Sequence, residues 1–299
     1  MIDDIGPQYS EDDNFKQLAR RHQSEFRANV LKAGYKGYGN RLDEVSAKTG
    51  LNFYSGIPDI FSKANERFTF KYSPLYFDML RSEHLPFNFM IPLEIKLEKD
   101  LAEKALSFLF GRRIRTITNI YIEWWPTPKE EFLNDSTAFD TYLEYVDKAG
   151  NFHAVGIEFK YTEKEYEYTE KEKKMLDDQN SIYWKTEIAI NLYREGSYDD
   201  LKSKIYKQFF RNHLLGFSML TSPRYKYLSS FTSVLMYPKG NSHFEAHSRK
   251  YNEFLNQEYQ LTFIPISFEE FIFQLNKWCT TDIIKNWLEY LQLRYIVNG

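Results

Sequence analysis

Three polar residues in the middle of the chain have the types and the spacing that metal-assisted hydrolysis requires. Glu158 and Lys160 are separated by one residue, and Asp140 precedes them in the sequence. Residues 138–146 and 152–161 both alternate apolar and polar positions, and the stretch between them is rich in turn-forming residues. This pattern predicts a β-hairpin that carries Asp140 on its first strand and Glu158 and Lys160 on its second.

The register of this hairpin decides whether the three residues meet. If Val146 faces Phe152 across the loop, then Asp140 faces Glu158. Side chains alternate between the two faces of a strand, so we expect Asp140, Glu158 and Lys160 to share one largely polar face with Glu144. The opposite face is the expected core face and carries Phe139, Leu143, Tyr145, Val155, Ile157 and Phe159.

Two opposed carboxylates repel each other unless a cation lies between them. Mg²⁺ prefers oxygen ligands and takes one or two carboxylates together with waters and phosphate oxygens, so we expect Asp140 and Glu158 to bind Mg²⁺ or Mn²⁺. Lys160 would orient or help deprotonate the attacking water and offset charge on the scissile phosphate. The predicted chemistry is phosphodiester hydrolysis. The alternative is a surface hairpin with ordinary ion pairs.

The same residues resemble a known signature. Residues 139–140 (Phe-Asp) and 156–161 (Gly-Ile-Glu-Phe-Lys-Tyr) resemble the motif of the PD-(D/E)XK nuclease superfamily, although phenylalanine stands where the superfamily name has proline. Residues 21–27 (Arg-His-Gln-Ser-Glu-Phe-Arg) and 208–213 (Gln-Phe-Phe-Arg-Asn-His) resemble a bacterial branch of it.

This resemblance implies an α/β fold of the restriction-endonuclease type, with a mixed β-sheet flanked by helices. It also implies a Mg²⁺-dependent nuclease that acts on DNA, in restriction, defence or repair. Within the superfamily, an acid on an early helix often adds to the metal site and a glutamine on a later helix often supports it; Glu25 and Gln208 are the candidates. A homodimer is compatible with the resemblance, which does not decide the oligomeric state.

Other motifs offer competing interpretations. Pro58-Asp59 followed by Glu94-Ile95-Lys96 spells the superfamily pattern more literally, but proline-interrupted sequence separates the two halves. His243 and His247 have helical spacing but lack the glutamate of a zinc-protease motif, so we expect surface histidines. Trp124 and Trp125 could stack on bases or pack in the core.

The charge of the chain is not that of a general nucleic-acid binder, because the net charge is −3. Residues 201–252 contain nine Lys or Arg against one acid, Glu245, and could form a phosphate-facing surface or an ordinary solvated face. Arg211, Asn212 and His213 within this stretch could likewise face phosphate or pack within a helix.

The remaining pattern alternates helices and strands, as expected for a single α/β domain over residues 1–299. Residues 51–94 are expected to form an irregular elaboration packed against the core. Helices are predicted at residues 14–32, 97–109, 198–220, 243–255, 268–275 and 282–295, and further strands at 114–125, 182–192, 230–237 and 259–265.

Composition places the protein in a broad class. An apolar fraction of 42% supports a real core, and a single cysteine, Cys279, excludes a disulfide scaffold and favours a reducing compartment, hence the cytoplasm. The N-terminus, residues 1–5, is acidic and lacks the apolar run of a signal peptide, and no apolar run reaches membrane-spanning length. We therefore expect no membrane association.

Two further functions remain open. A noncatalytic module that keeps the fold would bind nucleic acid or protein without metal-dependent turnover. A different hydrolase would use Asp59 and Glu94 instead of the hairpin.

Overall fold

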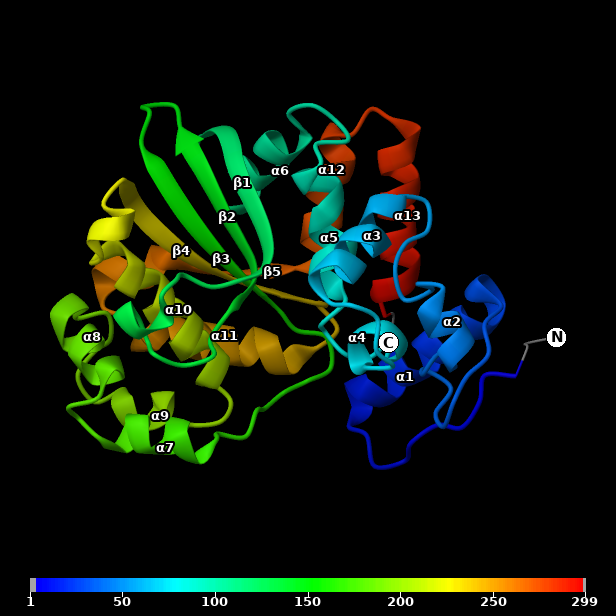
Figure 1. The fold of residues 1–299 in the computed structure, drawn as a ribbon, viewed down its shortest axis with the longest axis horizontal. Coiled ribbons are helices and arrows are strands. Elements are labelled where there is room, and N and C mark those ends of the chain that lie inside the picture. Colours follow the sequence, from blue (N-terminus) through cyan, green and yellow to red (C-terminus); the bar gives the residue numbers. More distant parts are fainter. Residues whose placement is uncertain (1–3, 298–299) are drawn as a thin grey trace.

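A five-stranded mixed β-sheet organises the molecule, and the computed structural model describes residues 4–297 (Figure 1). Residues 1–3 of the N-terminal segment lie outside that range. The strands follow one another across the sheet in chain order, with β1, β2 and β3 antiparallel and β3, β4 and β5 parallel. Their bounds are β1 Ile114–Trp124, β2 Phe139–Asp147, β3 Phe152–Phe159, β4 Leu228–Tyr237 and β5 Phe263–Ser267. The predicted mixed sheet flanked by helices is confirmed.

Helices cover both faces of this sheet (Figure 1). One layer contains α1 Asn14–Phe26, α5 Leu85–Glu94, α6 Leu101–Leu109, α12 Phe268–Trp278 and α13 Asp282–Tyr295, with the short helices α2 Glu44–Lys48, α3 Pro58–Arg67 and α4 Pro74–Phe77 beside it. The other contains α7 Glu170–Asp177, α8 Ile182–Ile190, α9 Tyr198–Leu201, α10 Lys207–Leu220 and α11 Ser242–Phe254. Short helical turns occupy η1 Arg27–Leu31, η2 Lys129–Glu131, η3 Pro223–Tyr225 and η4 Gln257–Thr262.

The hairpin of β2 and β3 has the predicted register, with Val146 opposite Phe152 and Thr141 opposite Ile157. The expected core face is buried against the first helical layer at Leu143, Tyr145, Val155, Ile157 and Phe159. Phe139 instead joins a second apolar cluster on the opposite face. Helix α10 packs on β3 and β4 across this second face, so the polar face of the hairpin is also covered by protein.

One predicted strand is wrong. Residues 182–192 form α8, which ends at Ile190, because the buried residues Tyr183, Trp184 and Glu187 recur at helical spacing while Ile188 is 71% exposed. The isoleucines of this segment favour a strand, but packing of one side of the segment against the rest of the protein outweighs that preference. The predicted helix over 198–220 is likewise interrupted, since α9 ends at Leu201 and α10 begins at Lys207.

Residues 51–94 are more regular than expected. They contain α3, α4 and α5, each of which carries a proline in its first turn, where the missing N–H costs nothing. Helix α5 is buried at nine of its ten positions and packs on β1, so this segment supplies part of the core and does not merely decorate it. Across residues 4–297, no helix has the length and apolar character needed to cross a membrane.

Candidate active site

Asp140 and Glu158 lie at the end of the hairpin, one residue beyond the paired residues Thr141 and Ile157. The backbone N–H of Phe159 donates a hydrogen bond of 2.7 Å to Oδ2 of Asp140. Asp140 remains partly accessible, whereas Glu158 is only 5% exposed. The continued register therefore brings the two predicted carboxylates together, with Asp140 on the more open side.

Lys160 closes the other side of Glu158. Its Nζ donates to Glu158 Oε1 at 2.5 Å and to the Tyr166 hydroxyl at 3.2 Å, and lies 4.2 Å from the centre of the Tyr166 ring. The lysine is 3% exposed. A buried ammonium is thus held between a carboxylate and a phenol ring, both of which favour its charged form.

Helix α10 supplies two amides to the same carboxylate. Asn212 Nδ2 donates to Glu158 Oε2 at 2.6 Å, and Gln208 Nε2 lies 3.5 Å from Oε1, a long contact. These residues are four apart and share one helix face. Oδ1 of Asn212 is buried without a hydrogen-bond partner. Gln208 was predicted from the resemblance, whereas Asn212 was expected to face phosphate or to pack within a helix and not to support Glu158.

A third carboxylate was missed by sequence reasoning. In the β1–β2 ladder, Ile122 pairs with Thr141 and Trp124 with Phe139, which places Glu123 opposite Asp140. Its φ of 53° is left-handed, an uncommon conformation for this residue type. The sequence offered a signal for Glu123, because the predicted strand over 114–125 contains this residue and would pair with the hairpin strand that follows it in the chain.

The three carboxyl groups disturb one another. Burial, followed by the charges of Glu158 and Glu123, holds the pKa of Asp140 well above its usual range. Burial and then the charge of Glu158 raise the pKa of Glu123 to about 7. Burial alone would lower the pKa of Lys160, but the charge of Glu158, with Tyr166 adding to it, outweighs burial and raises it. Lys160, together with Arg67 near Glu123, does not compensate the three acids, since the pKa values of Asp140 and Glu123 remain raised, so the cluster favours a further positive charge.

A family model described as the PD-(D/E)XK nuclease superfamily matches residues 10–297. The chain belongs to the PD-(D/E)XK nuclease superfamily. Comparisons with curated proteins and with solved structures give no match. Membership agrees with the acid-x-Lys hairpin and with the mixed sheet flanked by helices.

The residues present fit the divalent metal that the superfamily implies. Hard oxygen donors converge from three strands through Glu123, Asp140 and Glu158, and Mg²⁺ prefers such donors. The raised pKa values of Asp140 and Glu123 express an electrostatic cost that a divalent cation would remove. Within residues 4–297, no three His, Cys, Asp or Glu side chains already stand in ligand positions, so binding would require side-chain adjustment.

Glu25 is not brought into this cluster. It lies on α1 with its side chain 35% exposed, and its Oε1 accepts a hydrogen bond from Arg21 Nε at 2.9 Å. Its neighbour Gln23 is the buried residue of that turn and donates to the Tyr161 hydroxyl and to the backbone carbonyl of Arg294. Sequence resemblance located the early helix, but the acid that accompanies Asp140 comes from β1.

The competing motif does not converge. Asp59 is exposed in the first turn of α3, while Glu94 at the end of α5 accepts a 2.7 Å ion pair from Lys63. Lys96 donates instead to the backbone carbonyl of Ile117. The literal sequence match therefore has no geometric counterpart.

The remaining candidates are resolved by their contacts. The rings of His243 and His247 lie 4.3 Å apart and are partly buried, and burial with the charge of His247 lowers the pKa of His243 to about 4. His213 lies in an aromatic core, where burial lowers its pKa to about 3. Trp124 stacks on Tyr142 with ring centres 3.9 Å apart. Only the other tryptophan of the pair, which is 41% exposed, could stack on a base.

The basic stretch over residues 201–252 is not a free cationic surface. Most of its cations form ion pairs with acids from the same or neighbouring segments; the paired cations are Lys202, Lys204, Lys207, Arg211, Arg224, Arg249 and Lys250. The interpretation as an ordinary mixed-charge face is therefore better supported than a phosphate-binding surface.

Proposed function

We propose that this protein is a Mg²⁺- or Mn²⁺-dependent nuclease that hydrolyses phosphodiester bonds in DNA. The observation that carries the proposal is the cluster of Glu123, Asp140 and Glu158 around the buried Lys160, which lacks compensating positive charge. Asp140 and Glu158 would hold the metal. When bound, the metal would polarise the phosphate and activate a water molecule.

The other residues have roles that follow from their contacts. Lys160 has a raised pKa and stays protonated at neutral pH, so it would donate to the phosphate or to the water and offset negative charge. Removal of the water proton by its amine is the less favoured role. Asn212 and Gln208 orient Glu158 by donating to its two oxygens. Tyr166 holds the Lys160 ammonium in place.

Cleavage of a labelled oligonucleotide with Mg²⁺, Mn²⁺ or EDTA tests this proposal. Asp140→Ala and Lys160→Ala are each expected to reduce the metal-dependent rate about 100-fold or more, because each removes a group that acts on the reacting phosphate. Asp59→Ala serves as the control, since it removes an exposed acid of the competing motif and should leave the rate unchanged. Loss of activity only in Asp59→Ala would assign the chemistry to that motif.

A noncatalytic binding module is the second candidate, because the pair of Lys160 and Glu158 is already satisfied without metal. Calorimetric titration of Mn²⁺ and Mg²⁺ into the wild type and into Asp140→Asn/Glu158→Gln separates the two. Binding lost only in the double variant supports the nuclease. Equal or absent binding, with both proteins folded, supports the module.

The wider setting is also a proposal. A single cysteine, Cys279, partly buried and unpaired, suits the reducing cytoplasm of a bacterium. Restriction, defence and repair are the settings in which such a DNA nuclease would act, and the assembly we propose is a homodimer. Sedimentation with and without DNA would test the oligomeric state.

A further inference from the structure

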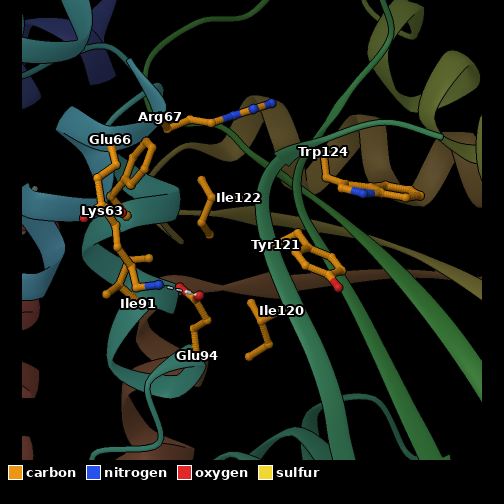
Figure 2. A pocket seen from close by; sticks show the side chains of 10 residues that line it. Lys63, Glu66, Arg67, Ile91, Glu94, Ile120, Tyr121, Ile122 and Trp124 are labelled. Carbon is orange, nitrogen blue, oxygen red and sulfur yellow. Dashed lines mark hydrogen bonds and ion pairs between the residues drawn. The ribbon is translucent and has the colours of Figure 1, made fainter. Parts of the chain in front are cut away.

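A groove leads to the three carboxylates from the side of β1. A hollow of about 570 Å³ lies between the α3–α4 segment and the end of β1, and Glu83 and Glu123 form its inner wall. A second hollow of about 360 Å³ runs along β1 beside α3 and α5. Arg67 lines both, and Figure 2 shows it extending from the end of α3 toward the end of β1. We call the two hollows together the Arg67 groove.

One residue, Glu123, belongs both to the groove and to the carboxylate cluster. Glu123 faces Asp140 across the β1–β2 ladder, and its side chain also lines the larger hollow. Glu158 and Lys160, at 5% and 3% exposure, lie deeper than Asp140. Of the three carboxylates, Glu123 is therefore the one that lines the Arg67 groove, and Asp140 lies opposite it on the next strand.

Arg67 is fixed beside Glu123 by one hydrogen bond, which leaves its other N–H groups able to donate to a ligand. Its Nη2 donates to the backbone carbonyl of Glu123 at 2.6 Å, and its guanidinium carbon lies 5.0 Å from the centre of the Trp125 ring. In the chain from residue 4 to residue 297, its other N–H groups have no described acceptor. Lys71, also exposed, lines the same hollow. The two hollows are also lined by acids, namely Glu66, Glu83, Glu94 and Glu123, so the groove is not cationic as a whole. The remaining N–H groups of Arg67 and the ammonium of Lys71 are the donors that suit phosphate oxygens.

Aromatic rings stand exposed beside these cations, in a protein whose rings are mostly buried. Trp125 is 41% exposed, Phe68 is 39% exposed and Tyr121 is 44% exposed. Phe68 lines the larger hollow and Tyr121 the smaller. Exposed rings interleaved with cations are the arrangement by which proteins stack unpaired bases while tracking a backbone.

We propose that the Arg67 groove binds a single-stranded polynucleotide, with Trp125 stacked on an unpaired base and with Arg67 and Lys71 on phosphates next to Asp140. This inference rests on the proposed nuclease function and adds strandedness to it. Hollows of roughly 300 to 1,000 Å³ accommodate small molecules, so each hollow has room for a splayed nucleotide, and the exposed rings beside the cations favour unpaired bases. Because Glu158 is buried, we also expect a single strand to reach it more readily than a duplex.

Binding is measured by fluorescence anisotropy on the Asp140→Asn protein in EDTA, so that no strand is cut. The probes are a labelled thymidine oligonucleotide, a uridine oligonucleotide of equal length and a blunt DNA duplex. Trp125→Ala is expected to weaken single-strand binding about tenfold, as expected for loss of one stacking platform, and Trp125→Phe to restore most of it. The uridine arm shows whether the groove accepts RNA as well as DNA.

The chain offers a matched control. Trp125 borders the groove through the Arg67 guanidinium, which lies against its ring. Trp278 is 39% exposed and has the Lys277 ammonium 5.5 Å from its ring centre, and neither Trp278 nor Lys277 lines the groove. Trp278→Ala should leave binding unchanged. Equal effects of Trp125→Ala and Trp278→Ala, or duplex binding as tight as single-strand binding, would overturn the groove assignment.

Failure of this inference is distinguishable from failure of the proposed function. If wild type cleaves DNA with Mn²⁺ through Asp140 while Trp125→Ala binds normally, the nuclease proposal stands and the groove assignment is wrong. If Trp125 governs single-strand binding but no metal condition gives cleavage, the groove stands and the nuclease proposal is wrong.

Discussion

Glu123 shows how strongly the candidate site depends on charge. Burial raises the pKa of its carboxyl to about 7, the charges of Glu158 and Glu83 add to this, and Arg67 and Lys160 act in the opposite direction. A carboxyl whose folded-state pKa lies above its unfolded value binds its proton more tightly when folded. Its contribution to stability is therefore full below the unfolded pKa and is lost as pH rises through about 7.

Glu123→Gln should consequently flatten the pH dependence of stability. We expect the metal-free variant to be more stable than wild type by about 2 kcal/mol near pH 8 and nearly equal near pH 5, because one pKa unit corresponds to about 1.4 kcal/mol and partial solvent access discounts the shift. Urea unfolding at both pH values measures this. Glu187 also has a pKa raised to about 7 by burial, so the variant must be compared with wild type and not judged alone.

The control for this experiment is Glu130→Gln, an exposed carboxylate two residues before Phe132. Its stability should parallel wild type at every pH. If the stability of Glu123→Gln also parallels that of wild type at every pH, the pKa of the Glu123 carboxyl is not raised in the folded protein.

Single residues were predictable where local spacing alone decided their place. Asp140, Glu158 and Lys160 follow from one hairpin, in which alternation and loop length set the register. Glu123 required the pairing of a third strand and a left-handed backbone, which no local pattern indicates. Glu25 came from resemblance alone, and no contact described between residues 4 and 297 joins it to the cluster.

At the scale of elements, α10 is the support of the site. Arg211 is 5% exposed and binds two carboxylates, Asp135 from the β1–β2 connection and Glu172 from the first turn of α7. Lys207 also pairs with Glu172 at 2.9 Å. These contacts fix α10 against α7 and the β1–β2 connection, and the same helix presents Asn212 to Glu158 of the candidate site.

Arg211→Met should therefore be strongly destabilising. Removing one partner of a buried ion pair leaves uncompensated charge, here on Asp135, whereas Glu172 keeps its pair with Lys207; such a loss typically costs about 3 to 5 kcal/mol. Arg224→Met is the matched control, because Arg224 pairs with Glu131 at 2.7 Å on the surface, where such a pair contributes about 0 to 1 kcal/mol. Thermal unfolding of both variants measures the difference between their stability losses. Similar losses would show that burial does not strengthen the ion pairs of Arg211 with Asp135 and Glu172.

Helices and strands were predictable where one face of the element is clearly more apolar than the other. The final helix, over residues 282–295, has the predicted bounds because its apolar positions recur at helical spacing and its other faces are polar. Residues 182–192 were mispredicted because isoleucines and aromatic residues favour a strand and an isoleucine also stands on the exposed side, Ile188. Packing against α10 and α7 buries one side of the segment and selects the helix.

At the scale of the whole molecule, the sheet separates two apolar clusters, one on each face. Sequence analysis predicted the first face and described the second as polar, because the second core is assembled from residues distant in sequence, such as Tyr142, Phe210 and Phe231. Packing of residues 51–94 against the core was expected, but the helical form of α5 was not, because a helix that is apolar all round has no periodic signal. Burial of Glu158 and Lys160 is a consequence of this second layer.

The spacing between α10 and the sheet depends on Phe231, whose ring lies against Gly156 of β3 and Gly216 of α10. A Cβ atom at Gly216 would stand 2.1 Å from two carbons of that ring. Alanine in place of a helical glycine usually adds about 0.5 to 1 kcal/mol of stability. Here overpacking, which costs about 1 to 3 kcal/mol, should reverse the sign.

We therefore expect Gly216→Ala to destabilise the protein by about 1 to 2 kcal/mol, and Gly216→Ala/Phe231→Leu to recover part of the loss because a smaller side chain leaves room for the methyl group. Urea unfolding measures both. Since α10 also carries Asn212 and Gln208, an outward shift of the helix would weaken their hold on Glu158, and the cleavage rate should fall in the single variant and rise again in the double. A Gly216→Ala protein more stable than wild type would mean that the layer spacing is adjustable and that α10 does not rigidly position Glu158.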